Sequence, residues 1–197
     1  MGKERLLAMT DGVVAIIITI MVLEMKVPEH ATLEALGALW RIFLSYALSF
    51  LYVGIYWNNH HHYFHLVHHV NGAVLWANFN LLFWVSLVPF ATAWMGEREF
   101  APIPTAVYGI ALFMPALAWW LMQRVIIRMQ GPDSPMRQVL GRDLKANISP
   151  LLYAAGIVSS LFMPWVGLGC YLIVALTWLV PDRRIEKMIS QKGQTAA

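Results

Sequence analysis

The sequence predicts an all-α integral membrane protein with six transmembrane helices per subunit and both termini in the cytoplasm. Hydrophobic residues make up 59% of the 197 residues and charged residues only 13%, which is about half the charged share of a typical soluble domain. Six apolar stretches approach the length of about 20 residues that a helix needs to cross a bilayer. No stretch between them is long enough for a soluble domain, so residues 1–197 are expected to form a single six-helix membrane domain.

The candidate spans are residues 6–25, 33–57, 73–95, 104–127, 148–164 and 166–180. The first begins after two basic residues, and the second carries Arg41, which we expect to snorkel to the interface or to pair with Glu34. The third contains no charged residue, and the fourth contains none before Arg124. The last two are separated only by the segment "PWVGLG", a composition typical of a tight turn between helices.

Two pairs of small residues have the spacing of four that lets membrane helices pack closely. These pairs are Ser45 with Ser49 and Gly156 with Ser160. We therefore expect helix contacts at both places.

The basic residues indicate which side of the membrane each loop faces. Six crossings place both termini on one side, and that side also receives most of the Lys and Arg residues: Lys3, Arg5, Arg124, Arg128, Arg137, Arg142, Lys145, Arg183, Arg184, Lys187 and Lys192. The positive-inside rule makes this side cytoplasmic. The net charge of +3 and the pI of about 9.1 are therefore attributed to topology, and no nucleic-acid partner is expected.

The loops on the opposite side are acidic, with Glu24, Glu29, Glu34, Glu97 and Glu99. Such a surface would raise the local concentration of cations at an outer mouth. Ordinary solvated loop ends explain the same pattern equally well.

The first span contains polar groups that a membrane helix must pair. Only twelve residues separate Asp11 from Glu24, so Asp11 has to lie at or inside the cytoplasmic boundary. A carboxylate there costs about 2.5 to 3.5 kcal/mol on insertion scales and requires a partner. Arg5 lies about 120° away around the same helix, so each must pair with another helix or subunit. Thr10 either joins that network or donates to its own backbone.

A second feature of this span is a narrow stripe formed by Ile16, Thr19, Ile20 and Leu23 at successive spacings of three, one and three. Asp11 lies about 140° from the stripe, whereas Arg5 would lie about 20° from it in a continuous helix. The geometry alone favours bundle packing or lipid contact for the stripe over the lining of a pore.

At these residues the chain resembles a known family. Residues 5–11, "RLLAMTD", resemble the Arg-x-x-x-Phe-Ser-Asp signature of the transmembrane protein 175 family, the endolysosomal potassium channels and their bacterial relatives. Residues 12–28 are similar to the family's first helix, and residues 56–96 to its second-to-third helix region. Met9 and Thr10 depart from the signature, but Met keeps the bulk and Thr the hydroxyl, so the local network should survive.

The resemblance implies a homotetrameric potassium channel in the inner membrane of a bacterial cell. In such a channel the first helices of the four subunits surround a pore for K⁺. The resemblance implies no cofactor. In such a channel the position of Ile16 forms the narrowest ring, and those of Ile20 and Leu23 form further apolar layers. The position of Thr19 contributes to potassium preference in relatives. A ring of four isoleucines could gate by dewetting, so the resemblance favours pore lining for the stripe.

The family also implies that its signature residues bond to polar residues of neighbouring helices. The matching set here is Arg5, Thr10 and Asp11 with Trp57, His60 and Asn78, and His61 is a second choice for His60. Taken singly, Trp57 could instead be an interfacial residue and Asn78 an isolated helix contact.

A dense histidine cluster, "HHHYFHLVHH" at residues 60–69, supports the main rival function. His61, His65 and His69 have the i, i+4 spacing of a metal site. A histidine cluster of this density is more often a cationic face at the membrane interface. No resident metal is therefore expected. The rival is a six-span secondary transporter of divalent metal with a histidine-rich cytoplasmic end. It would need paired ligands at mid-membrane, which the predicted spans lack. No catalytic motif is evident, so we do not expect an enzyme.

Overall fold

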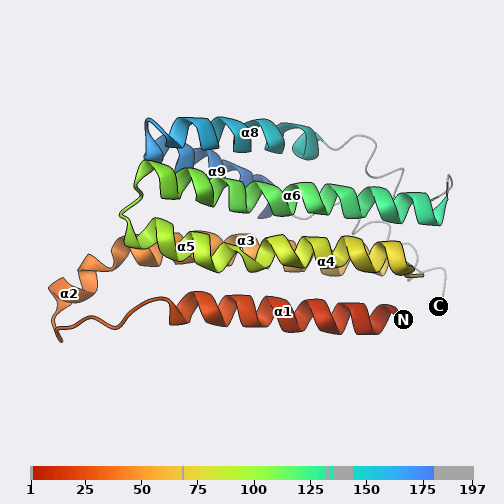
Figure 1. Ribbon diagram of the computed structural model, residues 1–197, viewed down its shortest axis with the longest axis horizontal. Coiled ribbons are helices and arrows are strands. Elements are labelled where there is room, and N and C mark those ends of the chain that lie inside the picture. Colours follow the sequence, from red (N-terminus) through yellow and green to blue (C-terminus); the bar gives the residue numbers. More distant parts are fainter. Residues whose placement is uncertain (1, 68, 132–133, 135–143, 180–197) are drawn as a thin grey trace.

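The computed structural model describes residues 2–67, 69–131, 134 and 144–179, and within these ranges the chain is helical and contains no strand. The elements are α1 (Lys3–Leu23), α2 (Leu33–Ala38), α3 (Trp40–His65), α4 (Gly72–Ser86), α5 (Val88–Glu97), α6 (Pro102–Gln130), α8 (Leu144–Ser160) and α9 (Pro164–Leu179). All but the short α2 run along the long axis of the molecule (Figure 1). The all-α prediction is confirmed.

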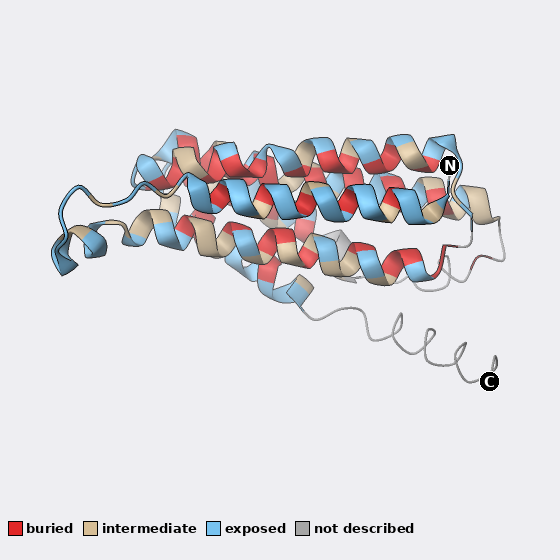
Figure 2. Cartoon of the chain, turned by 90° about the horizontal axis from the view of Figure 1, so that it is seen from below, coloured by how far each residue is buried: buried red, intermediate tan, exposed pale blue. Residues whose placement is uncertain are grey.

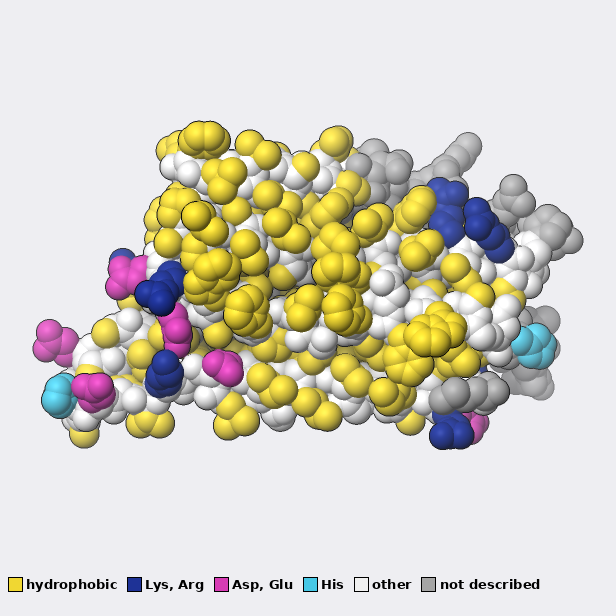
Figure 3. Space-filling view, in the orientation of Figure 1, with side chains coloured by type: hydrophobic (Ala, Val, Ile, Leu, Met, Phe, Trp, Pro, Cys, Tyr) yellow, Lys and Arg dark blue, Asp and Glu magenta, His cyan; other side chains and the backbone are white. Residues whose placement is uncertain are grey.

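Three helical stretches of the described chain are long and apolar enough to cross a membrane, namely Lys3–Leu23, Gly72–Glu97 and Pro102–Gln130. Two shorter apolar helices follow them, Ile148–Ser160 and Pro164–Leu179. α3 is equally long but ends in the polar segment "NNHHHYFH". Hydrophobic side chains cover the middle of the face shown in Figure 3, and the charged ones gather toward its two ends.

The second predicted span, residues 33–57, has different boundaries in the structure. The helix is interrupted at Leu39, whose ψ of 0° leaves the helical range, and α3 then continues through His65. Arg41 consequently lies at the start of α3 and binds Glu99, with 3.1 Å between Nη1 and Oε2. The predicted pairing of Arg41 with Glu34 was wrong, because Glu34 lies on the separate helix α2.

The turn between α8 and α9 lies before the segment "PWVGLG", and the prediction that this segment forms the turn was wrong. Pro164 begins α9, where its missing N–H group costs nothing. Gly167 lies inside α9 against α8. A Cβ atom at Gly167 would come within 2.8 Å of the backbone oxygen of Gly156 and would overlap the Ser160 side chain. The predicted small pair, Gly156 and Ser160, is therefore confirmed as a helix contact.

The replacement Gly167→Ala is expected to destabilise the α8 and α9 hairpin, because the new methyl group would meet backbone that cannot rotate away. Overpacking of this kind costs about 1 to 3 kcal/mol. The matched control is Gly169→Ala in the same helix, where nothing lies within 4 Å of the added Cβ. Thermal unfolding of the two purified variants in one detergent checks this, and equal melting temperatures would contradict the close packing.

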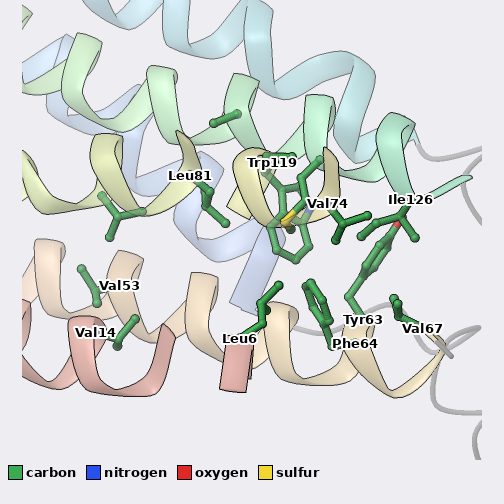
Figure 4. Close-up of a cluster of buried hydrophobic side chains, with 14 of the residues drawn as sticks. Leu6, Val14, Val53, Tyr63, Phe64, Val67, Val74, Leu81, Trp119 and Ile126 are labelled. Atoms are coloured by element: carbon green, nitrogen blue, oxygen red, sulfur yellow. The ribbon is translucent and has the colours of Figure 1, made fainter. Parts of the chain in front are cut away.

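Two buried clusters form the core. The first joins α1, α3, α4 and α6 and includes Leu6, Phe64, Val74 and Trp119 (Figure 4). The second joins α3, α5, α6, α8 and α9. Within the bundle the Ser49 hydroxyl shares hydrogen bonds with Thr92 at 2.6 Å and Tyr108 at 2.9 Å. α1 lies at the edge of the bundle and contacts α3, α4 and α5, so much of its surface has no neighbour among the described residues (Figure 1).

Candidate pore helix and its anchoring network

α1 buries one ridge against the bundle and exposes the rest of its surface. The ridge repeats at steps of three and four and consists of Leu6, Thr10, Val14, Ile17 and Met21. The predicted stripe lies off this ridge: Ile16 is 59% exposed, Ile20 40% and Leu23 78%, and Thr19 is exposed as well. Figure 2 shows the exposed band along α1. An apolar face of this kind is available to lipid, to another copy of the chain or to a pore.

The hydroxyl of Thr19 is held by its own helix. Its Oγ1 donates a hydrogen bond of 2.8 Å to the carbonyl oxygen of Ile16. A hydroxyl that donates once still has two acceptor lone pairs. The exposed Thr19 oxygen can therefore accept a hydrogen bond or contact a cation.

Beside the stripe, α1 and α5 enclose an open groove of about 400 Å³. Ile16 and Ile20 line it from α1, and Ser86 and Phe90 from α4 and α5. Glu24 stands at the same groove, at the end of α1. Ser86 and Phe90 could not be predicted from the sequence, because their approach to α1 depends on how the helices are ordered in the bundle.

A buried hydrogen-bond chain ties α1 to α3 and α4. Asn78 Nδ2 donates to Thr10 Oγ1 at 3.0 Å, and Asn78 Oδ1 lies 2.9 Å from His60 Nε2. All three side chains are at most 3% exposed. Thr10 also donates to the backbone oxygen of Leu6 at 3.0 Å, so the two alternatives for its hydroxyl occur together. His60, and not His61, is the residue that meets Asn78.

Asp11 makes a second link between α1 and α3 through the indole of Trp57, whose Nε1 donates to Asp11 Oδ1 at 2.9 Å. Both side chains are exposed, so this link lies at the surface of the chain. The structure therefore brings together five of the six predicted network residues. The Arg5 side chain is exposed and makes no hydrogen bond or ion pair with any described residue.

The histidine cluster is divided by the end of α3. His61 and His65 lie on the helix with their Nε2 atoms 3.1 Å apart, whereas His69 follows the end of the helix and His68 lies outside the described residues. Partial burial lowers the pKa of His65, and the neighbouring His61, Lys3 and His62 lower it further. No group of three metal-ligating side chains converges within the described ranges.

At the opposite end of the bundle, two glutamates of the predicted acidic surface are paired with cations. Lys26 Nζ lies 2.9 Å from Glu97 Oε1, and Arg41 holds Glu99. The hydrogen bond to Glu97 raises the pKa of Lys26. Glu24, Glu29 and Glu34 remain exposed there. The basic residues 137, 142, 183, 184, 187 and 192, on which the predicted orientation largely depends, lie outside the described residues.

Comparison with known proteins identifies similar chains over almost the whole length. The family model described as "Endosomal/lysosomal potassium channel TMEM175" matches residues 5–89. A potassium channel of Chryseobacterium sp. (strain P1-3) is 51% identical over 191 residues, which cover 97% of this chain and all of the relative. A potassium channel of Chamaesiphon minutus is 30% identical over 184 residues, covering 87% of this chain and 91% of the relative.

A solved structure supports the same grouping. The crystal structure of a lysosomal potassium-selective channel TMEM175 homolog from Chamaesiphon minutus superimposes with a TM-score of 0.75 at 29% identity. The match covers 89% of this chain and 95% of that one. The helical arrangement described above is therefore shared with a solved channel.

Proposed function

Because this chain belongs to the TMEM175 potassium channel family, we propose that four copies of it form a potassium-permeable channel whose pore is lined by α1. One observation carries the proposal: the stripe of Ile16, Thr19, Ile20 and Leu23 is exposed although three of its four side chains are apolar. In a tetramer the stripes of the four copies would face one another around a common axis. Each then lines the pore and is withdrawn from lipid.

The proposed pore is closed by apolar rings. Four copies of Ile16 make the narrowest ring, and Ile20 and Leu23 add layers toward the end of α1. A narrow ring without hydrogen-bonding groups disfavours water, so an ion would have to enter it without its hydration shell. Gating by dewetting follows if small movements of α1 widen the ring.

The network residues would act as the anchor of this gate. The buried chain from Thr10 through Asn78 to His60 fixes α1 against α3 and α4, and the bond from Trp57 to Asp11 fixes it at the surface. Buried polar groups that are fully paired specify one arrangement, since any shift leaves a donor or an acceptor unpaired. We propose that this anchor sets the height and rotation of the stripe. Arg5 is exposed on α1 and is proposed to pair across a subunit contact.

The proposed orientation is that of the positive-inside rule, with six crossings and both termini in the cytoplasm of a bacterial cell. In this orientation the anchor lies toward the cytoplasm. The exposed Glu24, Glu29 and Glu34 then face outward near the proposed outer mouth.

Replacing Thr19 with Val should lower the permeability ratio of K⁺ to Na⁺ by about fivefold, the equivalent of about 1 kcal/mol for one lost polar contact. The side chain keeps its shape, so flux itself should persist. The matched control is Thr177→Val in α9, whose hydroxyl also donates to its own helix, at 2.7 Å to Val174. Bi-ionic reversal potentials measure the ratio. An unchanged permeability ratio in Thr19→Val would show that Thr19 does not line the pore.

Flux from liposomes tests the proposed function. Purified protein is reconstituted with a potassium gradient, and matched vesicles receive a sodium gradient. We expect potassium efflux that depends on the protein and exceeds sodium efflux. Zinc transport without any potassium conductance would instead support the divalent-metal transporter.

A further inference from the structure

The paired histidines at the end of α3 are not used by the proposed gate. His61 and His65 lie one helical turn apart and turn their rings to each other, with ring centroids 4.6 Å apart and Nε2 atoms 3.1 Å apart. Both side chains are exposed. They can therefore exchange partners with the solvent.

The distance between the two nitrogens is close to the distance between two imidazole nitrogens that bind the same metal ion. Two imidazole nitrogens at about 2.0 to 2.1 Å from a tetrahedral Zn²⁺ stand about 3.3 Å apart. The observed 3.1 Å needs only a small rotation of the rings to reach this geometry. Imidazole is also a preferred ligand of Zn²⁺ among divalent ions.

The pair is connected to α1 by one further residue. His61 stacks on Trp57 with centroids 6.1 Å apart and an interplanar angle of 25°. Trp57 donates the hydrogen bond that holds Asp11 of α1. A metal ion that fixes the His61 ring would therefore also restrict the indole that anchors the proposed pore helix.

We propose that His61 and His65 form a binding site for one Zn²⁺ ion per chain, with water completing the coordination, and that the bound ion slows potassium flux through Trp57 and Asp11. The binding site stands on the geometry of α3 alone. The effect on flux rests on the proposed function.

Binding is measured on the purified full-length protein without a polyhistidine tag, by titration with Zn²⁺ in competition with a chromogenic zinc indicator. The His61→Ala and His65→Ala variants should each raise the Kd about tenfold or more, since a ligand contributes at least as much as the residues that orient it. The matched control is His62→Ala, which lies between the two on the same helix; its ring touches that of His61 edge-on, with centroids 5.8 Å apart, but it makes no hydrogen bond to either histidine. Its Kd should equal that of the wild type.

Three results would overturn the proposed site: no binding by the wild type, equal binding after His61→Ala, or an equal loss of binding in His62→Ala. The first would mean that the two rings form only a hydrogen bond.

Potassium flux in liposomes, with and without Zn²⁺, then tests the coupling to α1. We expect Zn²⁺ to slow flux in the wild type and not in His61→Ala or His65→Ala. Binding at the pair with unchanged flux would overturn the coupling and leave the site in place. A wild type that carries no potassium even without Zn²⁺ would overturn the proposed function, while the binding titration would still decide the site.

Discussion

Replacing Ile16 with Asn should raise potassium flux into liposomes by about tenfold, which corresponds to a barrier lower by about 1.4 kcal/mol. In the proposed tetramer, an amide at this position offers hydrogen bonds to water, so four copies would keep the proposed constriction wet. The smaller Ile16→Ala change should act in the same direction, because it widens the ring. Initial rates of potassium uptake, normalised to the amount of protein reconstituted, measure the effect.

The matched control for this prediction is Ile173→Asn. Ile173 lies in α9 and is 50% exposed, close to the 59% of Ile16, but α9 makes no part of the proposed pore. Any general effect of an exposed amide on insertion or assembly should affect both variants alike. If the initial rate of potassium uptake through Ile16→Asn equals the rates of Ile173→Asn and of the wild type, Ile16 does not form the constriction.

Replacing Asn78 with Leu should lower the free energy of unfolding by about 1 to 3 kcal/mol, the cost of leaving buried polar groups unpaired. The variant removes the partner of both Thr10 and His60, which are at most 3% exposed. The matched control is Asn59→Leu in α3, whose amide, among the described residues, bonds only to the Ile55 carbonyl of its own helix, at 2.9 Å. Denaturant unfolding in one detergent compares the two variants.

The same pair of variants separates anchoring from stability. If the network positions the stripe, Asn78→Leu should also change the flux per amount of folded protein, whereas Asn59→Leu should not. Equal unfolding free energies and equal flux in the two variants would mean that the buried chain from Thr10 to His60 contributes nothing specific.

The apolar helices and the network contacts could be predicted from the sequence because each depends on local pattern or on a motif. The stripe followed from spacing on one helix, and the exposed positions of Ile16 and Leu23 agree with a face separate from the buried ridge. The contacts of Thr10, Asp11, Trp57, His60 and Asn78 followed from the resemblance. Their roles, and the pore itself, remain predictions.

Other features depend on contacts between distant elements, and the sequence pattern alone did not reveal them. Arg41 binds Glu99 because the start of α3 and the end of α5 meet at one end of the bundle, while the break at Leu39 separates Arg41 from Glu34. The glycines after Pro164 resemble a turn, yet Gly167 is small because α8 approaches it closely. The α1 and α5 groove likewise exists only once the helices are packed.

The most direct test of the central proposal, a potassium pore lined by α1, is a thiol-block experiment on Ile20→Cys. The native Cys170 is first replaced by Ser, so that the new cysteine is the only thiol. Potassium currents of the purified protein in planar bilayers are recorded before and after a charged, water-soluble thiol reagent. We expect the reagent to abolish the Ile20→Cys current and to leave the parent current unchanged. A potassium current through Ile20→Cys that persists after complete labelling would contradict a pore lined by α1.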